Sequence, residues 1–209
     1  MFAEAVSSDT LRSLKILGKS GVLGKAYLAG GTALALQLGH RVSYDMDFFT
    51  QDEFEENAKA LEIVQVGKFE KEQLNWRTVM GKIEGVKFSL FYYDYPLVAE
   101  TIEFEGLRLA QPPDIAAMKL LAISDRGLQR DFVDLYWMRD LFTLEQVFEW
   151  YGQKFKDLKE KRYHLLRGLR YFEDADVDTP PNMIEPMNWD DVKQYFLGEV
   201  ARLSKEWGI

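Results

Sequence analysis

Residues 29–49, AGGTALALQLGHRVSYDMDFF, decide the fold of this chain. The apolar run at residues 25–29 predicts a buried strand that ends at the paired glycines. Residues 32–38 then predict a helix, because Gly39 follows them at the usual C-terminal position. A polar–apolar alternation that becomes wholly apolar at residues 44–49 predicts a second strand. A glycine turn and two aspartates therefore fall within one strand–helix–strand segment.

The paired glycines, Gly30 and Gly31, lie where the first predicted strand passes into the helix. Glycine permits a positive φ and close approach to the backbone, and the free N–H groups of a helix start attract phosphate. Thr32 adds a hydroxyl group. With Arg41 and Ser43, these residues form the expected nucleotide-binding set. The alternative is that the glycines serve only the sterics of a strand-to-helix turn.

Asp45 and Asp47 are two residues apart on the second predicted strand, so their carboxylates project from the same face. Two adjacent carboxylates repel each other, and a bound divalent cation relieves that repulsion. Mg²⁺ takes oxygen ligands, and nucleotide phosphates supply the rest of its shell. The flanking Met46 and Phe48 are apolar, which indicates a packed strand. The alternative is that Asp45 is a turn or cap residue and that Asp47 pairs with Arg41.

The spacing of these residues resembles a known signature. Gly-Gly, thirteen intervening residues (32–44) and Asp-x-Asp on an apolar strand are similar to the motif of polymerase-β-like nucleotidyltransferases. The longer string at residues 29–49 resembles the AbiEii/AbiGii toxin family, whose relatives include the MenA-like toxins. The resemblance implies a bacterial toxin paired with an antitoxin, and a Mg²⁺-dependent enzyme that transfers a nucleotide from a nucleoside triphosphate. Some relatives modify the 3′ end of tRNA, so tRNA is the expected acceptor, with a protein hydroxyl as the alternative.

A second stretch, PPDIAAMKLLAISDRGLQRDFVDLYWM (residues 112–138), is also similar to the family. By that resemblance Lys119, Asp131 and Asp134 are implicated in activity. The pattern itself places Lys119 on an inward-facing helical stripe, where it must extend to solvent or meet an anion. A nucleotide phosphate, or the two aspartates on one helix face, would be such an anion. The alternative for the two aspartates is that they lie in the first turn of a helix and complement its dipole. Arg130 is expected to contact a phosphate.

Polymerase-β-like enzymes usually carry a third carboxylate on a neighbouring strand, and here the expected position holds Ser89. The nearest acids, Glu84 and Asp94, have the opposite parity on the predicted strand. A serine cannot replace a carboxylate as a general base, whose removal typically costs about 100- to 10,000-fold in rate. Either Asp131 or Asp134 completes the site, or the chain is a non-catalytic nucleotide- or RNA-binding module.

The remaining pattern indicates an α+β fold, with a mixed β-sheet and flanking helices followed by an all-helical half. We expect a nucleotidyltransferase-like domain at residues 1–110 and a helical domain, contributing to the cleft, at residues 111–209. A loop is expected at residues 174–188. Further strands are predicted at residues 63–69, 76–83, 86–93 and 101–109, and helices at residues 7–23, 52–61, 114–124, 128–142, 143–157, 159–172 and 190–206.

The composition limits the chemistry. Among 209 residues there are no cysteines and two histidines, so a metal site within one chain must be built mainly from carboxylates. No apolar stretch has the length of a signal peptide or a bilayer span, which predicts a cytoplasmic protein without membrane contact. A net charge of −8 argues against a general nucleic-acid-coating protein.

Two features of the helical half leave alternatives open. Residues 154–170 hold seven basic and two acidic side chains, which form either a solvated helix face or a docking surface for an RNA backbone. Aromatic side chains in the same half form either a core or a docking surface for an antitoxin. These are Trp137, Phe148, Trp150, Tyr151 and Phe155.

Overall fold

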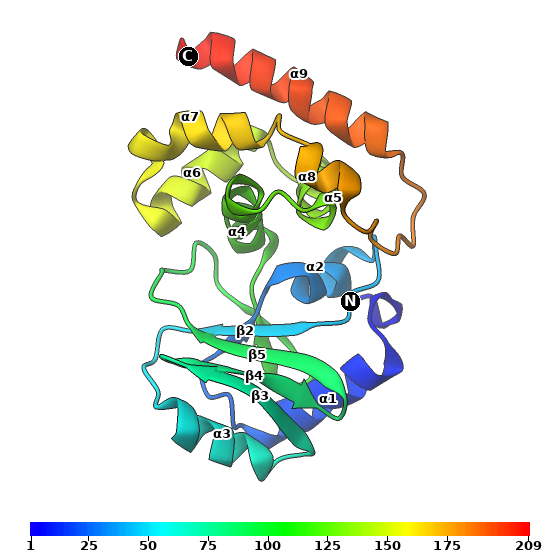
Figure 1. Cartoon of the computed structure of the whole chain (residues 1–209), viewed down its shortest axis with the longest axis vertical. Helices are drawn as coiled ribbons and strands as arrows, with labels where there is room; N and C mark the ends of the chain where they lie inside the picture. The colour runs from blue at the N-terminus through cyan, green and yellow to red at the C-terminus, as the bar shows by residue number, and fades with distance from the viewer. The chain divides into compact units, whose positions relative to one another are not determined.

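The computed structural model describes residues 1–209, which divide into two compact units, Met1–Gln111 and Pro112–Ile209. The first unit contains a seven-stranded mixed sheet with helices on both faces, and the second unit is built from helices (Figure 1). The predicted α+β fold class is therefore confirmed. No helix has the length and apolar character needed to cross a membrane.

The sheet of the first unit has the strand order β3-β4-β5-β2-β1-β7-β6. Strand β2 is central, runs parallel to β5 and antiparallel to β1, while β1 runs parallel to β7. Phe48 of β2 and Phe88 of β5 are fully buried, with ring centroids 5.8 Å apart. The strands are β1 (Tyr27–Leu28), β2 (Met46–Thr50), β3 (Phe69–Asn75), β4 (Thr78–Ile83), β5 (Val86–Tyr92), β6 (Ile102–Phe104) and β7 (Leu107–Leu109).

The helices of the first unit cover both faces of this sheet. Helix α2 lies on one face, and α1 and α3 lie on the other (Figure 1). Helix α2 is mostly apolar and is capped by Gly39, whose φ of 69° costs glycine little. The helices are the 3₁₀ helix η1 (Ala3–Ala5), α1 (Ser8–Ser20), α2 (Gly30–Leu38) and α3 (Glu56–Val64).

The N-terminal segment is hydrogen-bonded to the backbone around α2. The Phe2 N–H donates to the Leu36 carbonyl at 2.7 Å, and the Ser43 N–H donates to the Ala5 carbonyl at 2.9 Å. A parallel bridge between Val6 and Ser43 accompanies the second bond. The chain between α2 and β2 is therefore held from outside the strand–helix–strand segment.

The second unit packs around α4, which contacts α5, α6 and α7. Phe132 is fully buried and lies edge-on to Trp189 and Phe196. Phe148 and Tyr151 are also buried, which favours a core over a docking surface for these two rings. The helices are α4 (Pro112–Asp125), α5 (Gln129–Trp137), the 3₁₀ helix η2 (Met138–Asp140), α6 (Leu144–Phe155), α7 (Leu158–Gly168), α8 (Glu173–Val177) and α9 (Trp189–Trp207).

Two expectations about secondary structure are wrong. Residues 63–69 are not a strand: Ile63 is buried on the same side of α3 as Ala60, and the strand begins only at Phe69. Residues 174–188 are not entirely loop, because α8 occupies their start. Its Ala175 is fully buried, and the prolines that predict a loop all follow the end of this helix at Val177.

Candidate active site

The turn at Gly30 brings the start of α2 against β2. Gly30 has a φ of 64°, a conformation that side-chain-bearing residues rarely adopt. A Cβ placed on it would lie 3.9 Å from Oδ2 of Asp47, so this carboxylate adjoins the helix start. The Ala29 N–H donates to the Asp47 carbonyl at 3.0 Å, and this bond holds the residue before α2 beside Asp47. The free N–H groups and positive dipole end of α2 therefore face the same region as a carboxylate.

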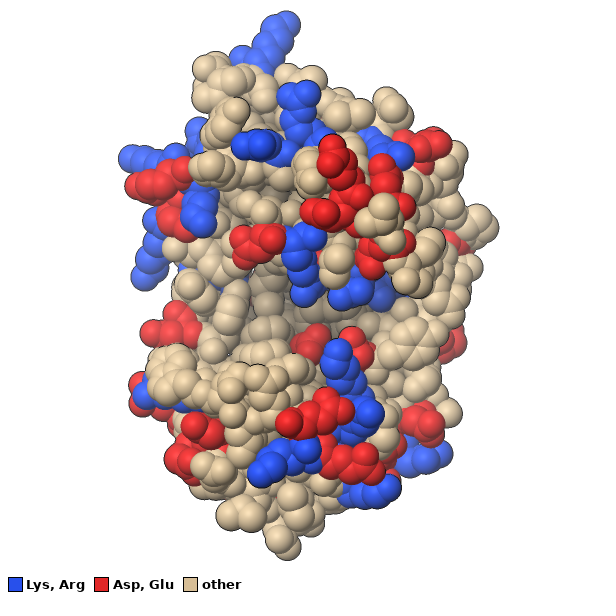
Figure 2. All heavy atoms as spheres, in the orientation of Figure 1, with Lys and Arg blue, Asp and Glu red and all other residues tan.

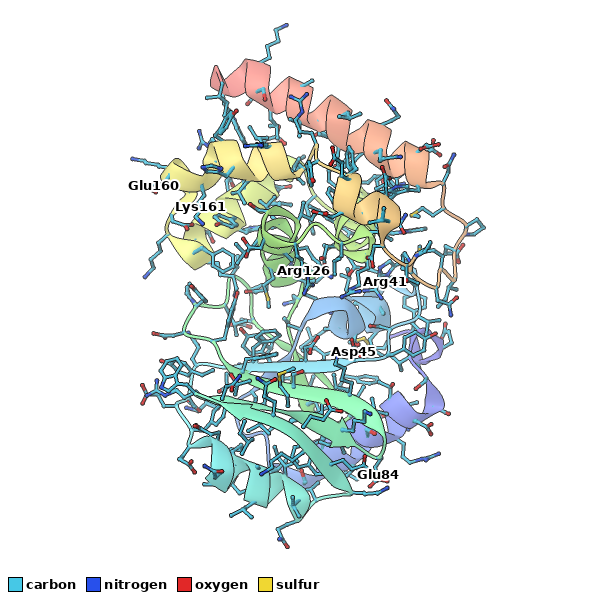
Figure 3. All side chains as sticks on the ribbon, viewed as in Figure 1. Arg41, Asp45, Glu84, Arg126, Glu160 and Lys161 are labelled. Atoms are coloured by element: carbon cyan, nitrogen blue, oxygen red, sulfur yellow. The ribbon has the colours of Figure 1, made fainter.

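Gly31 makes room for a guanidinium group. A Cβ on Gly31 would overlap Nη2 of Arg41 and lie 3.3 Å from Oγ of Ser43. The absence of a side chain is therefore required for Arg41 to occupy its place. Arg41 and Asp45 both belong to the segment between α2 and β2 (Figure 3).

Thr32 and Ser43 hold this segment in position. The Thr32 hydroxyl donates to the Asp45 carbonyl oxygen and lies 2.8 Å from the Ser43 hydroxyl. Both side chains are buried. Through these hydrogen bonds, Thr32 and Ser43 position the backbone that carries Asp45. Their direct contact with a nucleotide stays a prediction.

The two aspartates lie at the start of β2, two residues apart. Asp45 lies immediately before β2 and is exposed, and Asp47 is the second residue of β2 and partly exposed. The alternate residues Met46 and Phe48 are fully buried on the opposite face. Two solvent-accessible carboxylates with this spacing are the hard oxygen donors that Mg²⁺ accepts. No group of three or more acidic, histidine or cysteine side chains is arranged to hold a metal ion, so a cation bound by Asp45 and Asp47 would need further ligands of another kind, such as phosphate oxygens and water.

Ser89 lies directly beside Asp47. In the parallel pairing of β2 with β5, Asp47 is the register partner of Ser89, whose side chain is buried. This is the neighbouring-strand position at which the sequence predicts a missing third carboxylate. A serine hydroxyl does not ionise near neutral pH, so it supplies no negative charge there.

A separate charged cluster lies inside the helical unit. The Lys119 ammonium is 2.9 Å from Asp131 Oδ1 and 2.6 Å from Asp134 Oδ2, and both carboxylates are fully buried. Arg126 donates two further hydrogen bonds to Asp131, at 2.9 and 3.1 Å. The sequence suggests either a nucleotide phosphate or the two aspartates as the anion that Lys119 meets. In the structure Lys119 contacts the two aspartates. Arg130 is exposed at the start of α5. The activity predicted for these residues remains a prediction.

The cluster makes stability depend on pH in a defined direction. Burial alone would raise the pKa of Asp131, but the charges of Lys119 and Arg126 outweigh it, and the pKa lies below the usual value of 3.8. The folded state therefore binds fewer protons than the unfolded state in acid. The resulting stabilisation is complete above the unfolded pKa and is lost as the pH falls through the folded pKa.

We expect Asp131→Asn to flatten the decline of unfolding free energy with falling pH below about pH 4. Urea unfolding at a series of pH values measures this slope for wild type and variant. The slopes, not the absolute free energies, are compared, because the variant also loses a buried ion pair. Equal slopes would contradict the assignment of the lowered pKa to Asp131.

Comparison with known proteins covers most of the chain. The family described as "Nucleotidyl transferase AbiEii toxin, Type IV TA system" matches residues 12–96 and 82–202. An uncharacterized protein, aq_aa25 of Aquifex aeolicus (strain VF5), is 34% identical, with 86% of this chain and 88% of that protein aligned. The crystal structure of JHP933 from Helicobacter pylori has a TM-score of 0.59 at 19% identity, covering 96% of this chain and 94% of that one. The nucleotidyltransferase toxin MenT4 of Mycobacterium tuberculosis H37Rv has a TM-score of 0.57 at 16% identity, covering 92% and 82%. At these identities the two structures show a shared fold.

Proposed function

Because this chain belongs to the AbiEii nucleotidyltransferase toxin family, we propose that it transfers a nucleoside monophosphate from a nucleoside triphosphate to an RNA hydroxyl. The tRNA 3′ end is the proposed acceptor, and the proposed role is that of the toxin of a toxin–antitoxin pair with a cognate antitoxin as partner. One observation supports this most: Asp47 lies at a partly exposed position of β2 beside the start of α2, and the exposed Asp45 precedes it by two residues.

The proposed reaction is an in-line displacement at the α-phosphate. A bond forms between the acceptor oxygen and the α-phosphorus, the bond to the β-phosphate oxygen breaks, and pyrophosphate leaves. The acceptor hydroxyl would lose its proton to solvent water, and the carboxylates of Asp45 and Asp47 would favour that loss through the cation that they hold. When bound by these two carboxylates, Mg²⁺ would supply Lewis-acid stabilisation of the phosphate charge.

The other residues of the segment would hold the triphosphate. The N–H groups at Gly30 and Gly31 would donate to phosphate oxygens, as the start of a helix commonly does. Arg41, seated against Gly31, would neutralise phosphate charge. Thr32 and Ser43 would keep the carboxylate-bearing backbone in place through the hydrogen bonds described above.

A screen of nucleotides tests this function. The protein is incubated with each of the four α-³²P-labelled nucleoside triphosphates and total tRNA, with Mg²⁺ or with EDTA. We expect label to enter RNA with at least one nucleotide in Mg²⁺ and not in EDTA. If the label entered protein and not RNA, the acceptor would be a protein hydroxyl. Neither label nor pyrophosphate with any nucleotide would contradict the proposal.

The position of Ser89 beside Asp47 favours a second candidate, a non-catalytic nucleotide- or RNA-binding module. Both candidates bind a nucleotide or RNA, but only the enzyme transfers the nucleotide to an acceptor. Titration calorimetry with nucleoside triphosphates and Mg²⁺, run beside the screen, separates them. Binding without any transfer would favour the module.

A further inference from the structure

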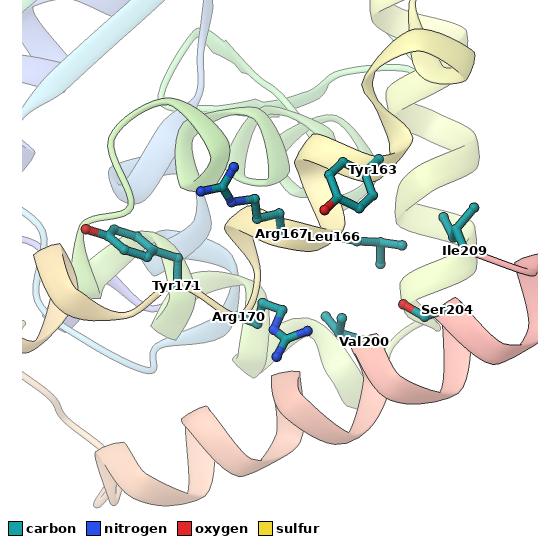
Figure 4. A pocket seen from close by; sticks show the side chains of 8 residues that line it. All are labelled: Tyr163, Leu166, Arg167, Arg170, Tyr171, Val200, Ser204 and Ile209. Atoms are coloured by element: carbon teal, nitrogen blue, oxygen red, sulfur yellow. The ribbon is translucent and has the colours of Figure 1, made fainter.

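A cavity of about 330 Å³ opens in the helical unit between α7 and α9 (Figure 4). Four of its lining residues recur at i, i+3, i+4 and i+7 along α7 and the turn after it, so they form one stripe that faces α9. This volume lies at the lower end of the range for small-ligand sites, about 300–1,000 Å³. We call it the α7–α9 pocket; it is lined by Tyr163, Leu166, Arg167, Arg170, Tyr171, Val200, Ser204 and Ile209.

The α7–α9 pocket contains two arginines without an ion-pair partner, and Glu173 lies at its edge, where it accepts a hydrogen bond from the Tyr171 hydroxyl. Arg167 and Arg170 are exposed, and neither guanidinium forms an ion pair or a side-chain hydrogen bond. By contrast, Arg202 of α9 pairs with Glu145 and Glu199. In a chain with a net charge of −8, two adjacent unpaired arginines in a cavity favour an anionic ligand.

Aromatic and apolar surfaces accompany these charges. The residues Tyr163 and Tyr171 are 63% and 44% exposed, so their ring faces remain available for stacking. Leu166 and Val200 are nearly fully buried and form an apolar floor. Exposed aromatic faces beside cations match a ligand that has both a planar base and a phosphate, which is how proteins hold single-stranded nucleic acid.

The surrounding surface extends the positive charge beyond one nucleotide. Lys156, Lys159 and Lys161 are exposed at the α6–α7 end of the unit and form no ion pairs, with Glu160 among them. Figure 2 shows Lys and Arg side chains gathered over this end, and Figure 3 marks Glu160 and Lys161 there. A run of cations leading to a cavity suits a polynucleotide backbone better than a free nucleotide.

We propose that the α7–α9 pocket binds one nucleotide of a single-stranded RNA segment, with phosphate on Arg167 and Arg170 and the base against Tyr163. The choice of RNA rests on the proposed function. The site itself lies wholly within the helical unit and shares no residue with the segment at residues 30–47.

Fluorescence anisotropy with a labelled single-stranded RNA of mixed sequence tests the pocket. Three proteins are compared with wild type: Arg167→Gln with Arg170→Gln, Tyr163→Leu, and a control, Lys19→Gln with Lys87→Gln, which removes two exposed charges from the sheet-containing unit. The arginine variant should bind at least about 10-fold more weakly and reduce the slope of log affinity against log salt by about 0.7, the contribution of the one phosphate contact that the two arginines share. The Tyr163 variant should bind about 5- to 100-fold more weakly with an unchanged salt slope.

The outcomes separate the pocket from the proposed function. The control should retain wild-type affinity, and circular dichroism should show that every variant is folded. RNA labelling by the wild type together with equal RNA binding by all variants would overturn the pocket and leave the proposed function standing. Absence of RNA binding by the wild type would overturn both the pocket and the RNA acceptor.

Discussion

Asp47→Asn is expected to reduce nucleotidyl transfer by about 1,000-fold or more, because losing a metal-binding carboxylate removes several kcal/mol of transition-state stabilisation. The amide keeps the shape of the side chain and removes its charge beside the start of α2. Asp47 is partly exposed, so the fold should tolerate the change. The rate of label transfer to RNA, measured with saturating nucleotide and Mg²⁺, gives the result.

Asp52→Asn is the matched control for this experiment. Asp52 follows the same strand and is exposed, and its carboxylate lies 3.8 Å from the exposed Lys25 ammonium. The same substitution there should leave the rate within about two-fold of wild type, because exposed ion pairs contribute little. Transfer by the Asp47 variant at the rate of this control would remove Asp47 from the active site.

Lys154→Met is expected to cost about 3–5 kcal/mol of unfolding free energy, the usual effect of removing one partner of a buried ion pair. The Lys154 ammonium lies 2.9 Å from Asp114 Oδ1, and both side chains are fully buried. Methionine fills similar volume but leaves the Asp114 carboxylate in the interior without that ammonium. Urea unfolding at neutral pH measures the change.

Two further variants interpret that loss. Lys156→Met replaces an exposed lysine two residues away and should change stability by less than about 0.5 kcal/mol. Adding Asp114→Leu to Lys154→Met should recover much of the loss, because a buried ion pair replaced by apolar residues is often neutral or stabilising. A loss below about 1 kcal/mol in Lys154→Met would show that the ion pair is not important for folding.

The strand–helix–strand segment was predictable because its signals are local. Paired glycines, an apolar helix and alternating residues lie next to one another in sequence, and neighbouring backbone geometry follows from them. The start of β2 was not predictable in this way. The strand was expected from Tyr44 but begins at Met46. The Asp45 carbonyl accepts from Thr32 and Ser43 bonds to Ala5, and neither bond is visible in the local pattern.

The helical unit shows the same limit for charged residues. The stripe on α4 predicts that Lys119 faces inward, yet a stripe does not identify which anion it meets, since that depends on how α5 packs. Lys154 was grouped with a basic surface, and its burial corrects that grouping. A signal was present, because Val147 and Tyr151 place Lys154 on a buried face at helical spacing.

The N-terminal backbone bonds to Leu36 and Ser43 have a practical consequence for handling the protein. A protease that cut the chain after Val6 would separate the N-terminal segment from the rest of the chain. The backbone hydrogen bonds of that segment to Leu36 and Ser43 would then be lost, although every candidate catalytic residue would remain. Activity and the integrity of the first six residues should therefore decline together during storage or digestion.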